Sequence, residues 1–300
     1  MKKTPPYLKT GDTIGIVSMA GRCNKEHLQT AVEVFNSWGL KVEQSENIFN
    51  YENQFASSDE NRLADLNSMI ENDKIKAIIS LRGGYGSVRL LEKINYKKLA
   101  ENPKWIIGFS DITAIHSAIA IKSNIKSLHA TMPVNFDSTH KNSLDTLHKA
   151  LFGEKVEYRT PNNELNRIGK AKGELVGGNL SVLYSLRGTE YDIDTKGKIL
   201  FIEDLNEYLY HLDRMMMNFK LGEKLADLKG LIIGAFSDMQ DNETKFGKNA
   251  YEIILDAVKD YNYPIIFDFK AGHIKENNAL IFGQEVEIDV SKSENCSIIF

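Results

Sequence analysis

The sequence predicts an α/β protein of two domains, and three observations support this prediction. The chain has 300 residues, whereas one domain usually has about 150. Short apolar runs that are typical of buried strands alternate with segments whose apolar residues recur at helical spacing. This alternation is typical of a parallel sheet covered by helices.

The first strand, the first helix and the second strand are expected within residues 11–42. Residues 11–21 begin as an apolar strand and end in small residues, and residues 28–35 carry apolar side chains at helical spacing. Gly39 ends this helix, and a second strand starts at 40–42. The glycines do not form the G-x-G-x-x-G pattern, so dinucleotide binding has little support.

The next helix is predicted over residues 58–73, because apolar residues there share one helix face. Its charged residues Arg62 and Asp65 are expected on the solvated face. Residues 76–81 then form a buried strand that leads into a glycine-rich segment.

This segment, Arg82-Gly-Gly-Tyr-Gly86, is called the glycine loop below. Its glycines provide backbone freedom either for an anion-binding turn or simply for a tight turn. It lacks the Lys-Ser/Thr ending of a P-loop, which disfavours nucleotide binding. In a doubly wound sheet, loops at the carboxyl ends of neighbouring strands share one edge. The N–H groups of Gly84 and Asp111 are therefore expected to form an oxyanion hole beside Ser110.

Ser110 lies between a predicted strand, residues 105–107, and a helix that starts at about Asp111. A serine at such a junction is held out from the sheet as in a nucleophile elbow, although only the first glycine of the G-x-S-x-G pattern, Gly108, is present. The alternative is that Ser110 merely caps the helix. His116, in the same helix, is expected to be a packing or surface residue, with a smaller chance of a role in the site.

The chain is expected to divide into three parts. Residues 1–151 form the first domain, whose helical residues continue with breaks to its end. Residues 152–172, with mixed charges and little periodicity, are predicted to be a linker. Residues 173–300 form the second domain.

The second domain is predicted to alternate strands and helices before it ends in β structure. Gly177-Gly178-Asn179 is expected to be a turn after a short strand. The later strands are expected at 198–204, 229–236 and 264–268, and the helices at 180–186, 208–225 and 250–258. Residues 279–290 and 297–300 are β-like and suggest a hairpin that closes this domain.

Three side chains at or just past predicted strand ends could form a catalytic triad. Ser110 provides a hydroxyl nucleophile, and His273, after a glycine in a polar loop, could act as its base. Glu203, at the end of the 198–204 strand, could orient the imidazole. The serine would come from the first domain and the other two from the second, so the active site is expected at the domain interface.

Composition excludes several classes of protein. The hydrophobic fraction is 42%, the charged fraction is 26% and the net charge is −4, which disfavours a dedicated nucleic-acid binder. No apolar run reaches the roughly 18 residues of a membrane helix, and the basic N-terminus lacks the apolar core of a signal peptide. A cytoplasmic location is therefore expected. Cys23 and Cys296 have no partners at metal-ligand spacing, so neither a zinc site nor a disulfide framework is predicted.

The chain resembles the LD-carboxypeptidases, the serine peptidases that include murein tetrapeptide carboxypeptidases and microcin C immunity peptidases. The resemblance extends over nearly the whole chain, and its specificity comes from the order of seven segments. These are GDTIGIVS (11–18), RGGYG (82–86), IGFSDIT (107–113), GELVGGNL (173–180), ILFIED (199–204), HLDRM (211–215) and GHIKEN (272–277).

The resemblance implies roles for particular residues. Ser110 would be the nucleophile, Glu203 the orienting carboxylate and His273 the base, and Gly84 and Asp111 would donate the oxyanion-hole hydrogen bonds. It also implies a first domain with a parallel sheet between helices, a smaller, mostly β second domain, and a homodimer without metal. No cofactor is expected.

Two further residues of the glycine loop are candidates for substrate binding. Arg82 would suit the free carboxylate of an exopeptidase substrate, or it would instead brace the loop. Tyr85 is the second candidate.

The predicted function is release of the terminal D-alanine from murein tetrapeptides, by cleavage after lysine or diaminopimelate, in cell-wall peptide recycling. One alternative is a microcin-C-immunity-type peptidase that acts on peptidyl or aminoacyl nucleotides. The other is a non-catalytic muropeptide-binding protein.

Overall fold

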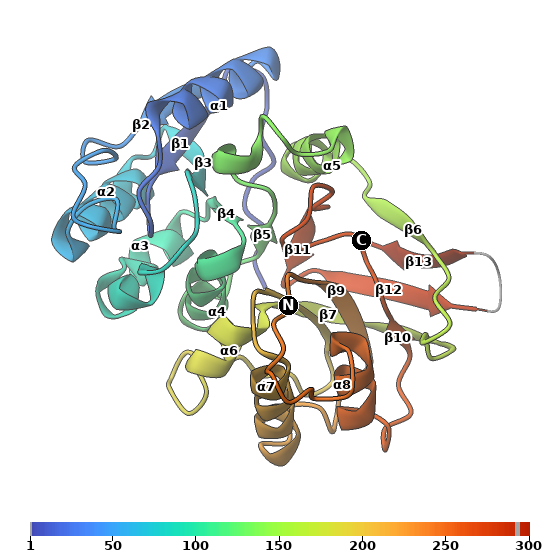
Figure 1. The fold of residues 1–300 in the computed structure, drawn as a ribbon. Coiled ribbons are helices and arrows are strands. Elements are labelled where there is room, and N and C mark those ends of the chain that lie inside the picture. The colour runs from blue at the N-terminus through green and yellow to red at the C-terminus, as the bar shows by residue number, and fades with distance from the viewer. Residues whose placement is uncertain (1, 292–294) are drawn as a thin grey trace. The chain divides into compact units, whose positions relative to one another are not determined.

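The computed structural model describes residues 2–291 and 295–300 and divides the chain into two compact units (Figure 1). The first unit contains Met1–Lys155 and Lys275–Gly283, and the second contains Val156–Ile274 and Gln284–Phe300. The sequence predicts a single change of domain across residues 152–172, whereas the chain in fact returns to the first unit for one short segment. Each unit is described by itself below.

The first unit is built on a six-stranded sheet in the order β11-β5-β4-β3-β1-β2. Its strands are β1 (Thr13–Val17), β2 (Lys41–Gln44), β3 (Ile75–Ser80), β4 (Trp105–Gly108), β5 (Ser127–His129) and β11 (Leu280–Phe282). β1 to β5 are parallel, and β11 is antiparallel to β5. The strand order reverses between β1 and β3, and such a switch point is where open α/β sheets bind ligands. The predicted parallel sheet is confirmed.

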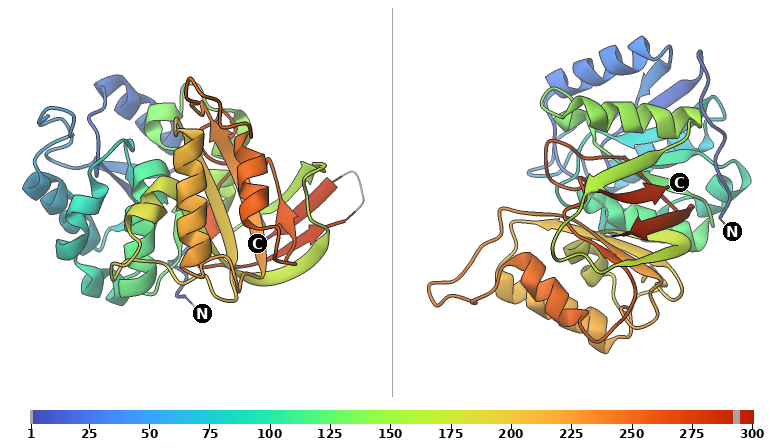
Figure 2. Two further views of the ribbon diagram at one scale, coloured as in Figure 1. Left: turned by 60° about the horizontal axis from the view of Figure 1, so that its bottom comes forward. Right: turned by 90° about the vertical axis from the view of Figure 1, so that its right-hand side faces the viewer.

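Helices connect these strands. They are α1 (Lys25–Ser37), α2 (Asp59–Glu71), α3 (Tyr96–Glu101), α4 (Thr113–Lys122) and α5 (Lys141–Phe152), with short 3-10 helices η1 (Ser87–Lys93), η2 (Ser110–Ile112) and η3 (Pro133–Asn135). α1 packs with η3, and α2, α3 and α4 pack with one another, so helices cover both faces of the sheet (Figure 2).

The second unit has a seven-stranded sheet in the order β10-β9-β8-β7-β12-β13-β6. Its strands are β6 (Glu157–Pro161), β7 (Gly169–Asn179), β8 (Ile199–Leu205), β9 (Gly230–Ser237), β10 (Ile265–Ile266), β12 (Glu285–Val290) and β13 (Asn295–Ile299). β7 to β10 are parallel, whereas β12, β13 and β6 pair antiparallel. The second unit is therefore mixed α/β rather than mostly β.

Three helices belong to the parallel half of this sheet: α6 (Leu180–Ser185), α7 (Leu209–Leu221) and α8 (Ala250–Ala257). The buried side chains of α7 include Leu212, Met215, Met216 and Phe219, which join β8, β9 and α8 in one apolar core. The methionines of α7 thus serve packing, as an unbranched, polarisable side chain is suited to do.

Four local predictions differ from the structure, each because of a contact with a distant part of the chain. The predicted linker contains β6, whose Tyr158 and Thr160 are buried against the sheet, and the start of β7. The predicted helical region before residue 151 contains β5. The residues predicted as a hairpin of the second domain include β11, which pairs with β5 in the first unit.

The fourth difference concerns Gly177-Gly178-Asn179, predicted as a turn, which is the end of the long strand β7. A Cβ atom at Gly177 would lie 1.9 Å from the carbonyl oxygen of Phe201. The glycine is therefore required for close approach of β8 to β7 and does not mark a chain reversal.

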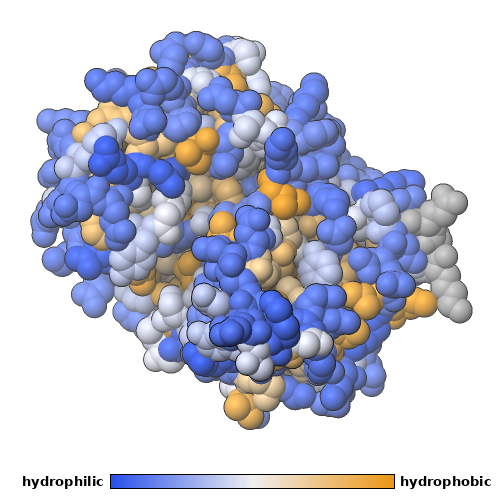
Figure 3. All heavy atoms as spheres, in the orientation of Figure 1, coloured by the Kyte–Doolittle hydropathy of each residue, from blue (hydrophilic) through white to orange (hydrophobic). Residues whose placement is uncertain are grey.

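On the face shown in Figure 3, hydrophilic residues predominate and apolar residues are visible mainly between them. Among the described residues, no helix has both the length and the apolar character that crossing a membrane requires.

Candidate active site

Ser110 occupies a sharp turn at the carboxyl end of β4. Its backbone φ is 62°, in the left-handed region that residues other than glycine seldom adopt. Such strain is a feature of the nucleophile elbow, where the serine projects from a strand-to-helix turn. The N-cap residues of the two following helical segments are Phe109 and Ile112. Ser110 is therefore not the N-cap residue of either helical segment, and its role as nucleophile stays a prediction.

The incomplete elbow pattern has a structural explanation. Ile112 stands where the pattern has its second glycine, and its side chain packs over Gly108. A Cβ atom at Gly108 would lie 2.9 Å from Cγ1 of Ile112. The first glycine of the pattern thus makes room for the larger residue that replaces the second.

The glycine loop lies directly against Ser110. A Cβ atom at Gly83 would be 3.2 Å from the Ser110 Oγ atom. Gly84 has a φ of 108°, and its N–H has no hydrogen-bond partner among the residues that the structure describes. Asp111 lies in the first turn of η2, where amide hydrogens lack partners within the helix. Both amides are suitable candidates for oxyanion donors.

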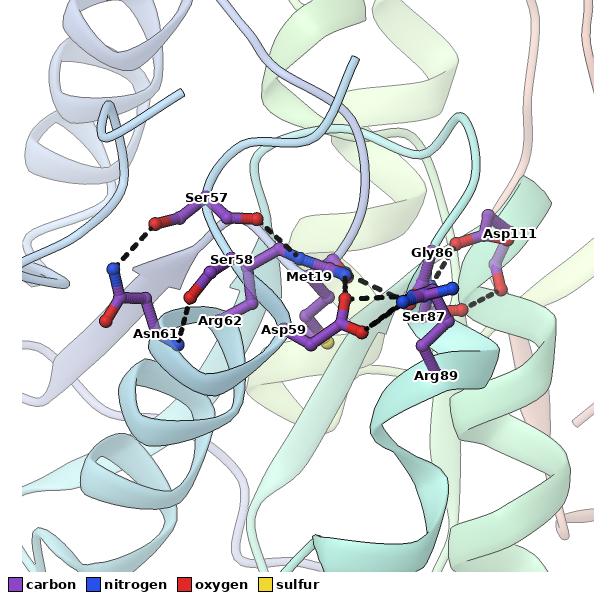
Figure 4. Close-up of polar contacts among 10 residues, drawn as sticks. All are labelled: Met19, Ser57, Ser58, Asp59, Asn61, Arg62, Gly86, Ser87, Arg89 and Asp111. Atoms are coloured by element: carbon purple, nitrogen blue, oxygen red, sulfur yellow. Dashed lines mark hydrogen bonds and ion pairs between the residues drawn. The ribbon is translucent and has the colours of Figure 1, made fainter. Parts of the chain in front are cut away.

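The Asp111 side chain ties the glycine loop to the Ser110 turn (Figure 4). Its Oδ2 atom accepts a 2.8 Å hydrogen bond from the Ser87 N–H, and the Ser87 hydroxyl donates a 2.6 Å bond to the Asp111 carbonyl oxygen. Burial raises the pKa of Asp111, although the hydrogen bonds from Ser87 and Gly86 act in the opposite direction. The residue therefore contributes its side chain to the loop as well as its amide to the candidate oxyanion hole.

His116, on α4, contacts the strand end that precedes the Ser110 turn. Its Nε2–H donates a 2.8 Å hydrogen bond to the Gly108 carbonyl oxygen. Burial lowers the pKa of His116 to about 4, although the bond to Gly108 acts to raise it. The imidazole is thus neutral at neutral pH, and the expectation of a packing residue is confirmed, at a position that holds the strand end before Ser110.

In the second unit, Glu203 and His273 are hydrogen-bonded partners. Glu203 is 0% exposed, and its Oε2 atom accepts a 2.7 Å hydrogen bond from Nδ1 of His273. The register of β8 with β9 shifts at Glu203: Ile202 pairs with Ile233, but Asp204 pairs with Phe236. Glu203 therefore lies opposite a β-bulge in β9, at the point where regular pairing of the two strands is interrupted.

The glycine before His273 is required by this pair. Gly272 has a φ of 112°, and a Cβ atom there would lie 2.7 Å from Oε2 of Glu203. The Ser237 hydroxyl also donates a 3.2 Å hydrogen bond to the His273 carbonyl oxygen, which fixes this loop to the end of β9. The Gly-His motif is thus explained by close approach of the loop backbone to a buried carboxylate.

Charges around His273 favour its protonated form. Burial by itself lowers the pKa of His273, but the charge of Glu203, the hydrogen bond to it and the charge of Asp204 together raise it above 6.5. Burial and the charge of Glu203 raise the pKa of Asp204 to about 7, against the hydrogen bonds it accepts from its neighbours. An imidazole in this setting is suited to accept a proton.

The predicted site residues thus form two local groups. Ser110, Gly84 and Asp111 lie together in the first unit, and Glu203 and His273 lie together in the second. Within the glycine loop, Arg82 donates a 2.9 Å hydrogen bond from Nη1 to the Arg22 carbonyl oxygen, which braces the loop.

Substrate-binding and metal-binding candidates can also be compared with the structure. Tyr85 is 50% exposed. Among the described residues, no three His, Cys, Asp or Glu side chains gather in a way that would hold a metal ion.

The sequence-based expectation for Arg62 and Asp65 is wrong, because both side chains are buried instead of solvated. Arg62 is 1% exposed, and sequence reasoning did not identify it as a candidate for the site. The helical spacing of Arg62 to Leu66 and Met69, both buried, is a signal that could have identified it.

Comparisons with known proteins agree with this architecture. Residues 14–130 match the family model described as the LD-carboxypeptidase N-terminal domain, and residues 172–288 match that of the C-terminal domain. The probable murein peptide carboxypeptidase of Bacillus subtilis (strain 168) is 33% identical, over 96% of this chain and 92% of the relative. The microcin C7 self-immunity protein MccF of Escherichia coli is 25% identical, over 97% and 94%. The crystal structure of muramoyltetrapeptide carboxypeptidase from Oxalobacter formigenes has a TM-score of 0.87 at 26% identity, over 96% of this chain and 98% of that one.

Proposed function

Because the chain belongs to the LD-carboxypeptidase family and is a serine-type carboxypeptidase, we propose that it releases the terminal D-alanine from murein tetrapeptides. The bond cleaved is the one that joins D-alanine to L-lysine or to the L-centre of diaminopimelate. The observation that carries this proposal is the hydrogen bond between buried Glu203 and His273. A carboxylate placed in this way fixes the tautomer of an imidazole base and stabilises its protonated form.

In the proposed mechanism, the Nδ1–H of His273 stays bonded to Glu203, so Nε2 is the ring nitrogen without a hydrogen and its lone pair is the one that accepts a proton. Ser110 Oγ attacks the carbonyl carbon of the diamino acid residue as its proton passes to Nε2 of His273. The negative charge that develops on the carbonyl oxygen accepts hydrogen bonds from the N–H groups of Gly84 and Asp111.

Collapse of this tetrahedral species breaks the C–N bond, and His273 gives its proton to the amine of the departing D-alanine. The diamino acid residue remains as an ester on Ser110. His273 then takes a proton from a water molecule as the water oxygen attacks the ester carbonyl carbon. The bond between this carbon and Ser110 Oγ breaks, His273 returns the proton to Oγ, and the shortened peptide leaves with a free carboxylate. Neither step requires a metal ion or a cofactor.

The glycine loop is the proposed contact for the substrate's free carboxylate. An exopeptidase must hold this group, and arginine binds carboxylates through a fork of donors. Arg82 braces the loop through Nη1, and Tyr85 is half exposed. We propose that both residues contribute to substrate binding, with replacement of either raising KM more than it lowers kcat.

A second candidate function is supported by the similarity to MccF of Escherichia coli, which covers 97% of this chain. The same Ser110, His273 and Glu203 would then act on a peptidyl or aminoacyl nucleotide. The chemistry is unchanged, and only the group on the leaving side of the bond differs.

The test is incubation of the purified protein with free murein tetrapeptides that contain either L-lysine or meso-diaminopimelate. Mass spectrometry should show loss of one alanine with the unmutated protein and none with Ser110→Ala. Cleavage of an aminoacyl sulfamoyl nucleotide but of neither tetrapeptide would favour the second candidate. Tetrapeptide binding without turnover in the unmutated protein would support a non-catalytic binding protein instead.

The cellular setting is part of the proposal. We propose that the enzyme is a cytoplasmic homodimer that acts in cell-wall peptide recycling, as the family resemblance implies. Sedimentation of the purified protein at two concentrations tests the dimer, and fractionation of cells tests the location.

A further inference from the structure

The position of the glycine loop depends on contacts outside the loop itself. Residues 82–86 form no helix or strand, yet an oxyanion donor must be held to within a fraction of an ångström. At the start of the loop, the Gly83 carbonyl oxygen accepts a 3.0 Å hydrogen bond from the Gly21 N–H. At its end, Ser87 is bonded to Asp111. The Gly86 carbonyl oxygen accepts a 3.2 Å hydrogen bond from the Arg89 N–H, within the same stretch of chain, and a 3.0 Å bond from Arg62, on α2.

Arg62 binds carbonyl oxygens of three separate loops (Figure 4). Its Nε donates to Ser57, after β2, at 3.2 Å, and its Nη1 donates to Gly86, after β3, at 3.0 Å. The same Nη1 also donates to Met19, after β1. These loops follow three neighbouring strands of a parallel sheet. A single guanidinium therefore joins the loops at the edge of the sheet where the strands have their carboxyl ends.

The fit around the guanidinium is close. A Cβ atom at Gly86 would lie 2.9 Å from Nη1 of Arg62, and the φ of Gly86 is 131°. The ring of Phe55 packs against the guanidinium, with its centroid 5.1 Å from Cζ. Movement of the Arg62 side chain therefore requires movement of the loop end beside it.

A buried cation requires compensation, and Asp59 supplies it. Asp59 pairs with Nη2 of Arg62 and also with Arg89, whose Nε lies 2.7 Å from Oδ2. The hydrogen bond from Arg89 and the charge of Arg62 hold the pKa of Asp59 below its usual range, against the opposing effect of burial. Apolar replacements of buried ion pairs are often neutral or stabilising, so stability by itself does not account for a guanidinium here. The presence of a guanidinium is explained by its planar fork of donors, which can bind several carbonyl oxygens at once.

We propose that Arg62 is a positioning residue for the oxyanion hole: it fixes the Gly86 end of the glycine loop and so holds the Gly84 N–H in place. Arg62 acts on the transition state through Gly84 and does not contact substrate. This inference rests on the proposed function, since it requires a tetrahedral oxyanion at Ser110.

The test compares Arg62→Met, Arg62→Lys and Arg62→Ala with a matched control, Lys104→Met. Lys104 is also 1% exposed, and its ammonium binds the Met69 and Asn72 carbonyl oxygens at the opposite end of α2. Each replacement by methionine removes a buried cation and the hydrogen bonds that it donates to carbonyl oxygens, but only Arg62 is next to the glycine loop.

The readouts are kcat and KM for the tetrapeptide that the unmutated protein cleaves best, normalised to the folded fraction measured by circular dichroism. Loss of a whole oxyanion donor lowers kcat by about 100- to 1,000-fold. A displaced donor should cost less, so we expect a fall in kcat of about 10- to 100-fold for Arg62→Met. KM should change by less than about threefold, because the ground state makes little use of this donor.

Rescue separates positioning from a general structural role. Arg62→Lys, which keeps the charge but has no planar fork, should recover only part of kcat. Guanidinium ion at non-denaturing concentration should raise the kcat of Arg62→Ala and leave that of the unmutated protein unchanged. Lys104→Met should lower stability while kcat per folded molecule stays at the unmutated value.

Two results would overturn the inference. One is an unchanged kcat in folded Arg62→Met, or in folded Arg62→Lys if the methionine variant does not fold. The other is an equal fall of kcat in Lys104→Met, which would show a general structural effect. Absence of activity from the unmutated protein would instead overturn the proposed function, so the two failures are distinct.

Discussion

Replacement of Glu203 by glutamine provides the most direct test of the proposed charge arrangement. Glutamine has nearly the same size as glutamate, so the side chain still fits between β8 and the Gly272 loop, where the carboxylate is 0% exposed. What is lost is the negative charge 2.7 Å from Nδ1 of His273. The amide can present its NH₂ group to Nδ1, which would move the imidazole proton to Nε2 and remove the base.

Removal of the charge from a triad carboxylate lowers kcat by about 10⁴-fold in the general case, or ~5 kcal/mol of barrier. We expect a loss of this size for Glu203→Gln. The pH profile provides a second readout. Glu203 is one of the groups that raise the pKa of His273, and the base must be neutral to act. The acid limb of kcat/KM should therefore move to lower pH in the variant.

A matched control lies in the same unit. Glu207 accepts a 2.6 Å hydrogen bond from Nδ1 of His211 on α7, so Glu207→Gln removes the same kind of pair at a histidine that the proposed mechanism does not use. We expect an unchanged kcat and an unchanged pH profile for it. The reasoning is refuted if Glu203→Gln, folded, retains activity within tenfold of the unmutated enzyme and its acid limb does not move.

Three further predictions concern stability. Gly272→Ala should destabilise the protein by about 1–3 kcal/mol in urea unfolding, because it adds backbone strain and a contact with a buried carboxylate; an unchanged midpoint would contradict this. Gly177→Ala should prevent native folding, since its Cβ would lie 1.9 Å from a backbone oxygen, whereas Gly197→Ala, with nothing within 4 Å of its Cβ, should lose only about 1 kcal/mol to strain. The pKa of His116 is about 4 in the folded state and about 6.5 when unfolded, so the unfolded state binds more protons between these values and stability must fall as pH decreases from 6.5 to 4. This contribution is ~3 kcal/mol, and His116→Gln should have a smaller loss of urea stability between pH 7 and pH 5 than the unmutated protein.

Much of the first unit could be predicted from local patterns. The strand at 105–107, the turn at Ser110 and the helix after it follow from apolar spacing, because neighbouring residues decide these features. The structure agrees, with β4 ending at Gly108 and α4 beginning at Thr113. The helix predicted over 58–73 is likewise present as α2.

The failures have a common cause in contacts between distant residues. β11 joins the first sheet because it pairs with β5, about 150 residues earlier in the sequence. Gly177 is predicted to lie in a turn because its neighbours in the sequence do not indicate that the Phe201 carbonyl oxygen lies against it. In the sequence, Arg62 cannot be distinguished from an ordinary charged residue on a helix surface. Only in the folded protein do carbonyl oxygens of three loops bind its guanidinium.

By itself, the sequence determined the family, because the order of the motifs is specific to it, and it supplied the serine, acid and histidine to which we assign the chemistry. Only the tertiary structure decided the strained φ of Ser110, the hydrogen bond between Glu203 and His273, and the buried guanidinium beside the glycine loop. The physical reason is that residue type is local, whereas strain, strand register and burial arise only when separate segments pack against each other.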